Sequence, residues 1–133
     1  MRLITALSAV VILGLLSTFS GAHVPSAVPK RVTEANAGAQ IELRVGELLV
    51  VALAGNPTTG YQWEVVDLDA SIVKQLGEAT LEPSSAAIGA GGLITLQFRA
   101  VGIGETALKV VYRRPFEKEV PPLRVFAVTV IAK

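Results

Sequence analysis

LITLQFRAV, residues 93–101, alternates apolar and polar side chains along its length. This period of two is typical of a β-strand that buries one face and exposes the other. The residues predicted to point into the core are Ile94, Leu96, Phe98 and Ala100, and those predicted to point outward are Thr95, Gln97 and Arg99. The stretch decides the fold class because the segments around it show the same preference for strands.

Six other segments favour β-strands, and turn-forming residues separate them. With the stretch above, the predicted strands are residues 40–45, 48–53, 61–68, 72–76, 93–101, 106–112 and 123–132. The fourth has the weakest pattern and also fits a helical turn, whereas the last is apolar on both faces and is predicted to lie centrally in a sheet. No window shows helical periodicity with caps. The chain is therefore predicted to be all-β, an immunoglobulin-like β-sandwich with its only tryptophan, Trp63, buried in the third strand.

The first 22 residues have the pattern of a secretory signal peptide. Arg2 precedes an apolar run over residues 3–16, and Ser20-Gly21-Ala22 is a small-residue cleavage site. An uncleaved membrane anchor is the alternative, but the apolar run is shorter than the about 20 residues that a spanning helix needs. We expect export, to a periplasm or as a secreted protein, with no stable membrane insertion after the signal is removed.

Residues 23–37 follow this segment and contain Pro25 and Pro29 but little periodicity. They are predicted to be a flexible leader. The remaining residues, 38–133, form one predicted domain, which is large enough to fold around its own core.

Composition excludes several classes of function. The net charge is +1 with acids and bases interspersed, which argues against a nucleic-acid surface. The chain has no cysteine, and its one histidine, His23, precedes the predicted domain. The domain therefore lacks a Ser-His or Cys-His pair, and a zinc site is improbable. Its acidic residues are scattered, so nothing points to an enzyme, and we expect a monomer without metal, cofactor or disulfide.

The connections between the predicted strands alternate in length. Those at residues 54–60, 77–92 and 113–122 are long, and those between them are short. If each strand crosses the sandwich once, the chain reverses at every connection, so all three long loops emerge at one end. Clustered loops on a rigid sandwich often form a binding surface.

Each long loop has an unusual composition. The first contains GNPTTGY, in which Pro57 and Gly60 set the backbone and the two threonines can bond to it. The second contains AAIGAGGL, and its three glycines indicate either flexibility or close approach of a partner. The third contains YRRPF, with Phe116 either exposed as a binding residue or folded back onto the sandwich.

These three motifs, in this order and on the same predicted end, resemble those of the chagasin family of cysteine protease inhibitors. The resemblance spans residues 40–133. It implies an immunoglobulin-like fold and reversible, non-covalent inhibition of papain-like cysteine proteases, with the three loops entering the active-site cleft as a wedge. The protease-binding residues that it implies are Asn56, Pro57, Thr58, Thr59, Gly60, Tyr61, Gly89, Ala90, Gly91, Gly92, Arg114, Pro115 and Phe116.

The same resemblance places the glycine-rich loop nearest the catalytic cysteine, with the other two loops on either side. Phe116 stands where the family usually has a tryptophan. Two other functions are open to a sandwich with such loops: an immunoglobulin-like adhesion or ligand-binding module that uses the same loop end, and a hydrolase that uses the scattered carboxylates.

Overall fold

The computed structural model describes residue 14 and residues 28–133. Apart from Gly14, the predicted signal peptide lies outside the described residues, as does the leader up to residue 27. Among the residues described, no helix combines the length and the apolar character needed to cross a membrane.

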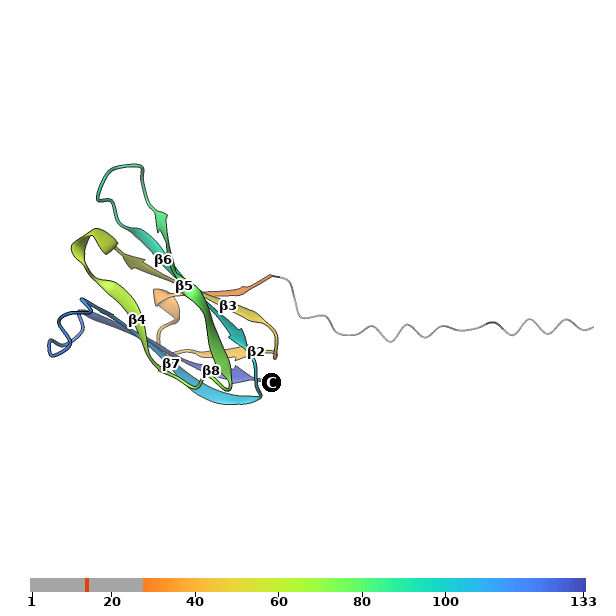
Figure 1. The fold of residues 1–133 in the computed structure, drawn as a ribbon. Coiled ribbons are helices and arrows are strands. Elements are labelled where there is room, and N and C mark those ends of the chain that lie inside the picture. The colour runs from red at the N-terminus through yellow and green to blue at the C-terminus, as the bar shows by residue number, and fades with distance from the viewer. Residues whose placement is uncertain (1–13, 15–27) are drawn as a thin grey trace, which may run out of the picture.

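Two four-stranded sheets face each other around one core (Figure 1). The strand orders are β1-β3-β6-β5 and β2-β8-β7-β4, which we call sheet A and sheet B. The strands are β1 Lys30–Thr33, β2 Gln40–Leu43, β3 Leu48–Gly55, β4 Gln62–Leu68, β5 Val73–Pro83, β6 Gly92–Ala100, β7 Gly104–Arg113 and β8 Arg124–Ala132, and the short 3₁₀ turns are η1 Glu34–Asn36 and η2 Pro57–Thr59. The architecture confirms the predicted all-β, immunoglobulin-like sandwich.

The alternation in residues 93–101 has the predicted orientation. Its four apolar residues line the core, and Phe98 is fully buried. Trp63 is buried as predicted, and β8 is central, between β2 and β7. Thr95 differs from the prediction, because it lies on the outward face but is only 9% exposed. Its hydroxyl oxygen is 2.6 Å from that of Thr80 on β5, so a cross-strand hydrogen bond occupies this position.

The N-terminal strand β1 corrects the predicted leader. Lys30–Thr33 pairs in parallel with β3, and Val32 is 2% exposed within the core. The prediction of a flexible leader is therefore wrong from Lys30 onward. The sequence pattern could not reveal this strand, because only one of its four residues is buried and alternation needs at least two.

Strand β5 is longer than predicted. The sequence predicts a fourth strand over residues 72–76, but β5 extends to Pro83, so part of the predicted loop 77–92 is paired with β6. The register shifts between Leu76 and Thr80, and Gly77 has a φ of +66°. This bulge interrupts the alternation, which explains why the sequence indicated a short strand followed by a loop.

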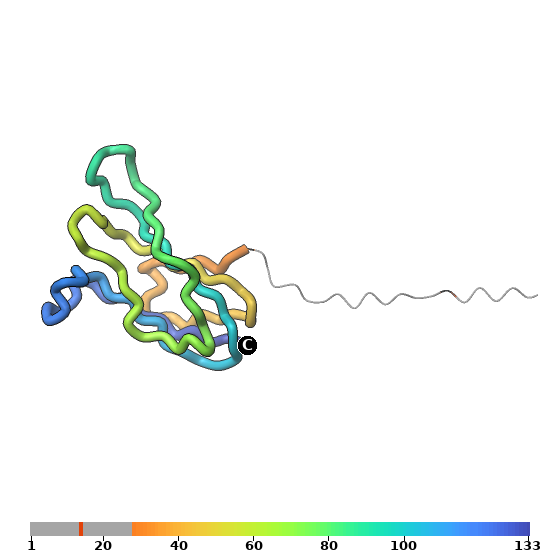
Figure 2. Tube along the Cα trace, viewed as in Figure 1, coloured from red at the N-terminus to blue at the C-terminus, as the bar shows by residue number. Residues whose placement is uncertain are grey.

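The three long connections emerge at one end of the sandwich, as predicted from their order (Figures 1 and 2). They are residues 56–61 between β3 and β4, residues 84–91 between β5 and β6, and residues 114–123 between β7 and β8. The C-terminus and the short turns lie at the opposite end. We call the three connections the first, second and third loops, and together the loop end.

The buried position of Val32 leads to a test of the N-terminal strand. Val32→Ala should lower the free energy of unfolding by about 2 kcal/mol, because it removes buried methyl groups and leaves a cavity. Arg31→Ala, at an exposed position of the same strand, should change it by less than about 0.5 kcal/mol. Urea unfolding of both variants measures the difference. Equal, negligible effects would mean that this segment does not pack on the domain.

Candidate functional site

The first loop is a stiff turn built around Asn56. The side-chain Oδ1 of Asn56 accepts hydrogen bonds from the backbone N–H of Thr58 at 3.1 Å and from its hydroxyl at 2.6 Å. The hydroxyl of Thr59 donates to the backbone oxygen of Asn56 at 2.6 Å. Gly60 ends the turn with a φ of +82°, a conformation that favours glycine. The turn therefore holds its shape through its own hydrogen bonds.

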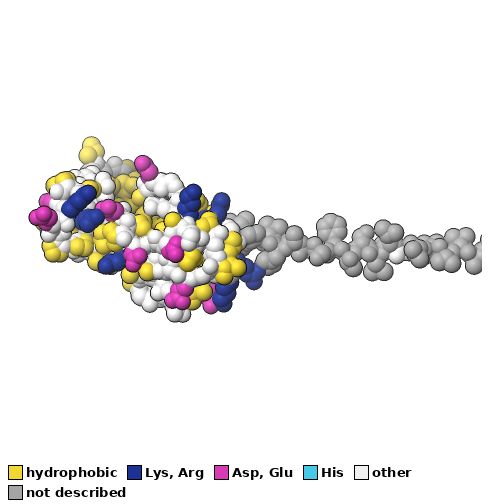
Figure 3. All heavy atoms as spheres, turned by 60° about the horizontal axis from the view of Figure 1, so that its bottom comes forward, with side chains coloured by type: hydrophobic (Ala, Val, Ile, Leu, Met, Phe, Trp, Pro, Cys, Tyr) yellow, Lys and Arg dark blue, Asp and Glu magenta, His cyan; other side chains and the backbone are white. Residues whose placement is uncertain are grey.

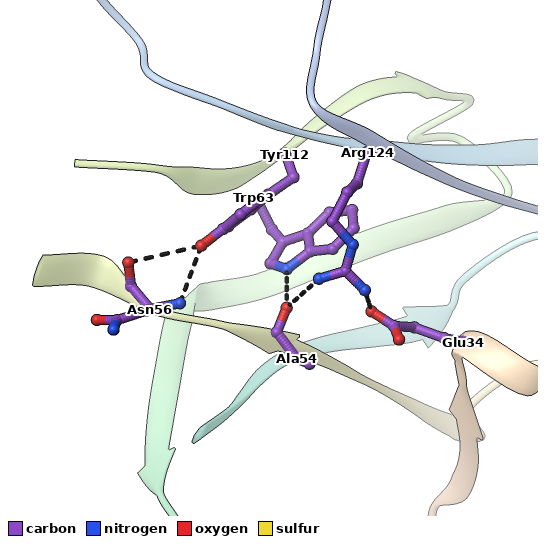
Figure 4. Close-up of polar contacts among 6 residues, drawn as sticks. All are labelled: Glu34, Ala54, Asn56, Trp63, Tyr112 and Arg124. Carbon is purple, nitrogen blue, oxygen red and sulfur yellow. Dashed lines mark hydrogen bonds and ion pairs between the residues drawn. The ribbon is translucent and has the colours of Figure 1, made fainter. Parts of the chain in front are cut away.

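Asn56 also joins the first loop to the second loop and to sheet B. Its side-chain Nδ2 donates to the carbonyl oxygen of Gly89 at 3.0 Å. Its backbone N–H donates to the hydroxyl of Tyr112 at 2.9 Å (Figure 4). Tyr112 belongs to β7 and is 6% exposed, so this bond connects the loop to the core of the sandwich.

The third loop is joined to the first through Arg114. The side-chain Nε of Arg114 donates to the carbonyl oxygen of Thr59 at 3.1 Å. The guanidinium carbon lies 4.6 Å from the centre of the Tyr61 ring, within cation–π range. Tyr61 in turn stacks on Tyr112 with 5.2 Å between ring centres. Each neighbouring pair of loops is thus connected, with the first loop in the middle.

Several large apolar side chains are exposed at this connected loop end, and Phe116 and Ile88 are the most exposed of them. Phe116 of the third loop is 77% exposed, and Ile88 of the second loop is fully exposed. Burying such side chains against a partner is favourable, whereas leaving them in water gains nothing. The alternative in which Phe116 folds back onto the sandwich is not what the structure shows.

The loop end carries no arrangement that suggests metal or acid–base chemistry. No group of three or more His, Cys, Asp or Glu that could hold a metal ion occurs among the residues described. The carboxylate of Glu64, on β4, accepts a hydrogen bond from Arg113 at 2.9 Å, and this bond lowers the pKa of Glu64. On the face drawn in Figure 3, basic and acidic side chains are interspersed.

Comparison with known proteins agrees with this geometry. Residues 42–130 match the model of the chagasin family of peptidase inhibitors, I42. The chain belongs to this family. Its relatives include amoebiasin-2 of Entamoeba histolytica, which is 26% identical over 118 residues covering 88% of this chain and 90% of that protein. Chagasin of Trypanosoma cruzi is 32% identical over 93 residues, covering 65% of this chain and 82% of chagasin.

The fold is also similar to that of a solved member of the same functional class. The crystal structure of a cysteine protease inhibitor from Entamoeba histolytica aligns with a TM-score of 0.66 and 25% identity, covering 78% of this chain and 94% of that chain. The family consists of inhibitors, which separates this protein from the hydrolase considered from sequence.

In this protein, the site residues predicted from sequence lie together in the three loops, apart from Gly92, which begins β6. The glycines of the second loop have internal reasons to be glycine. A Cβ at Gly92 would lie 2.0 Å from the carbonyl oxygen of Glu82, and one at Gly91 would lie 3.0 Å from that of Gly55. Gly89 has a φ of +78° but open space around it. Backbone neighbours therefore exclude a side chain at Gly92 and crowd one at Gly91, whereas the backbone conformation favours glycine at Gly89.

Sequence reasoning did not select Ile88, Tyr112 or Arg124 as site residues. Ile88 had a visible signal, since it is the only large side chain between Ser84 and Gly92. No signal in the sequence marked the hydroxyl of Tyr112, because its hydrogen bond to the Asn56 N–H joins two residues that are far apart in the chain. Arg124 lies within the predicted strand 123–132, and nothing in the local sequence marks it as a site residue.

The hydrogen bond between Asn56 and Gly89 can be removed on its own. Asn56→Asp keeps a side-chain oxygen for Thr58 but replaces the donor to the Gly89 carbonyl with a second acceptor. We expect faster amide exchange in the second loop and a loss of about 1 kcal/mol in the free energy of unfolding. Hydrogen exchange measured by NMR tests this.

A matched control is Asn36→Asp, which keeps the oxygen that accepts from the Thr33 N–H in η1. It should leave the second loop unchanged. If Asn56→Asp also leaves exchange in that loop unchanged, the bond to Gly89 does not hold the two loops together.

Proposed function

We propose that this protein is a reversible, non-covalent inhibitor of papain-like cysteine proteases and that its loop end enters the active-site cleft as a wedge. Membership of a peptidase inhibitor family supports this, as does the similarity to a structure that is itself a cysteine protease inhibitor. The observation that carries the proposal is the hydrogen-bonded connection of all three loops around Asn56, Thr59 and Gly89.

A connected loop end suits an inhibitor for an energetic reason. Binding a protease costs free energy for every loop and side chain that becomes ordered in the complex. Here the first loop is fixed by its internal hydrogen bonds, and the other two are bonded to it before any partner arrives. The ordering cost of binding is lowered accordingly.

The shape of the second loop suits a narrow cleft. Between Ser84 and Gly92 every side chain except that of Ile88 is small, so the backbone can approach a partner closely. The wedge would then present the turn at Pro57 in the middle, with the thin strip of the second loop on one side and Phe116 and Arg114 on the other. This order differs from the expectation from sequence that the other two loops flank the second loop. Reversible inhibition requires no chemistry from these residues, in keeping with the absence of a catalytic group among them.

Variants at the two most exposed large apolar side chains of the loop end test the wedge. Phe116→Ala and Ile88→Asp should each weaken inhibition of papain by about 1–3 kcal/mol, or about one to two decades in the inhibition constant. The melting temperature should change little, because both side chains are exposed in the free protein. The measurement is a titration against papain with a fluorogenic peptide, with a serine protease as specificity control.

Ile103→Asp is the matched control, since Ile103 is 81% exposed at the opposite end of the sandwich. It should inhibit like the unmodified protein. Inhibition that survives both loop variants would contradict the wedge, and an unmodified protein that fails to inhibit papain-like proteases would refute the function.

We also propose that the protein is exported. The support is the sequence pattern of residues 1–22, with cleavage expected after Ala22. Mass spectrometry of the protein from the extracytoplasmic fraction should find a mature N-terminus at His23. Recovery from the cytoplasm of a chain that still begins at Met1 would contradict export.

A further inference from the structure

Arg124, the first residue of β8, occupies the base of the loop end. Its Nη1 donates to the carbonyl oxygen of Ala54 at 2.9 Å, and its Nη2 forms an ion pair with Glu34 of η1 (Figure 4). Its guanidinium carbon lies 5.3 Å from the ring centre of Trp63 and 5.8 Å from that of Tyr112. One side chain therefore contacts three strands and the N-terminal turn.

The carbonyl oxygen of Ala54 accepts hydrogen bonds from two side chains of this cluster. Ala54 lies beyond Ala52, the last residue of β3 that pairs with β1. The indole N–H of Trp63 donates to the same oxygen at 3.1 Å. Trp63 and Arg124 both belong to sheet B, so these bonds hold the end of β3 in sheet A against the opposite sheet.

Ala54, whose carbonyl oxygen Arg124 binds, precedes Asn56 by two residues, and the connections between the loops depend on Asn56. The N–H of Asn56 is bonded to Tyr112, and Tyr112 packs on Trp63 with 5.0 Å between ring centres. Arg124 lies over both rings. A shift of its guanidinium would be transmitted directly to the carbonyl and the two rings that fix the start of the first loop.

Glu34 orients Arg124 from a segment outside the matched family region, which begins at residue 42. Strand β1 runs parallel to β3 and delivers η1 to the same end of the sandwich as the loops. The side chains of Arg124 and Glu34 are 37% and 41% exposed, and ion pairs of that exposure contribute little to stability. The main consequence of the pair is the direction in which the guanidinium points.

We propose that Arg124, oriented by Glu34, is a positioning residue for the inhibitory loops, so that the segment before residue 38 takes part in inhibition. This inference rests on the proposed function. Arginine suits the role because its planar fork donates to Ala54 and to Glu34 at once while its face lies on the aromatic rings. Lysine keeps the charge but lacks both the fork and the face.

The first experiment needs no protease. In Arg124→Lys, amide exchange at Asn56 should be faster than in the unmodified protein, and the fluorescence of Trp63, the only tryptophan, should change. Glu34→Ala should produce the same changes to a smaller degree. Glu42→Ala is the matched control, because it removes an exposed ion pair with Lys133 near the C-terminus, away from the loops.

The second experiment measures inhibition of papain by the same purified variants. We expect Arg124→Lys and Glu34→Ala to weaken it about two- to tenfold, the range expected when one long side chain no longer preorganises its neighbours. Glu42→Ala should inhibit like the unmodified protein, and the melting temperatures of all variants should stay close together.

The outcomes separate the two proposals. Unchanged exchange at Asn56 in Arg124→Lys overturns the positioning role, and so does unchanged inhibition by both variants. Weaker inhibition with unchanged exchange also overturns it, since Arg124 would then act by touching the protease itself. If the unmodified protein does not inhibit papain-like proteases, the proposed function fails, and the exchange experiment still decides whether Arg124 positions the loops.

Discussion

The two sheets of the sandwich are joined at the loop end by side chains that reach from sheet B to the end of β3. Backbone hydrogen bonds operate within each sheet and cannot hold one sheet to the other. The links are made by the Tyr112 hydroxyl, the Trp63 indole and the Arg124 guanidinium, which bond to the backbone of Asn56 or Ala54. The shape of the loop end depends on these bonds, because the first loop begins at Asn56 and the other two loops are bonded to that loop.

Much of this architecture can be predicted from local patterns. Alternation of apolar side chains identified the strand at residues 93–101 and its core-facing residues, and the order of short and long connections placed the three loops at one end. Both inferences rest on short-range rules of strand geometry and chain reversal. They needed no knowledge of which strands pair.

The features that sequence did not reveal all depend on pairing or on long-range contact. Strand β1 buries only Val32, so it becomes a strand by pairing with β3 and not by its own pattern. The bulge after Leu76 conceals the second half of β5. The thinness of the second loop was visible, but its cause was not, since the carbonyl that forbids a side chain at Gly92 belongs to Glu82 on another strand.

The bulge in β5 has a consequence for solubility. Each sheet has two edges, and strands β4 and β5 each form one of them. Both carry a break in register, after Val65 in β4 and after Leu76 in β5. An unpaired straight edge is a template on which another chain can add as a further strand, and bulges are a common protection against such aggregation. In β5 the break leaves two regular stretches of only four residues, Val73 to Leu76 and Thr80 to Pro83, and the second ends in a proline. Strand β5, the longest in the part of the chain that the structure describes, is therefore a poor surface for edge-to-edge growth, which favours a chain that stays dispersed when it accumulates.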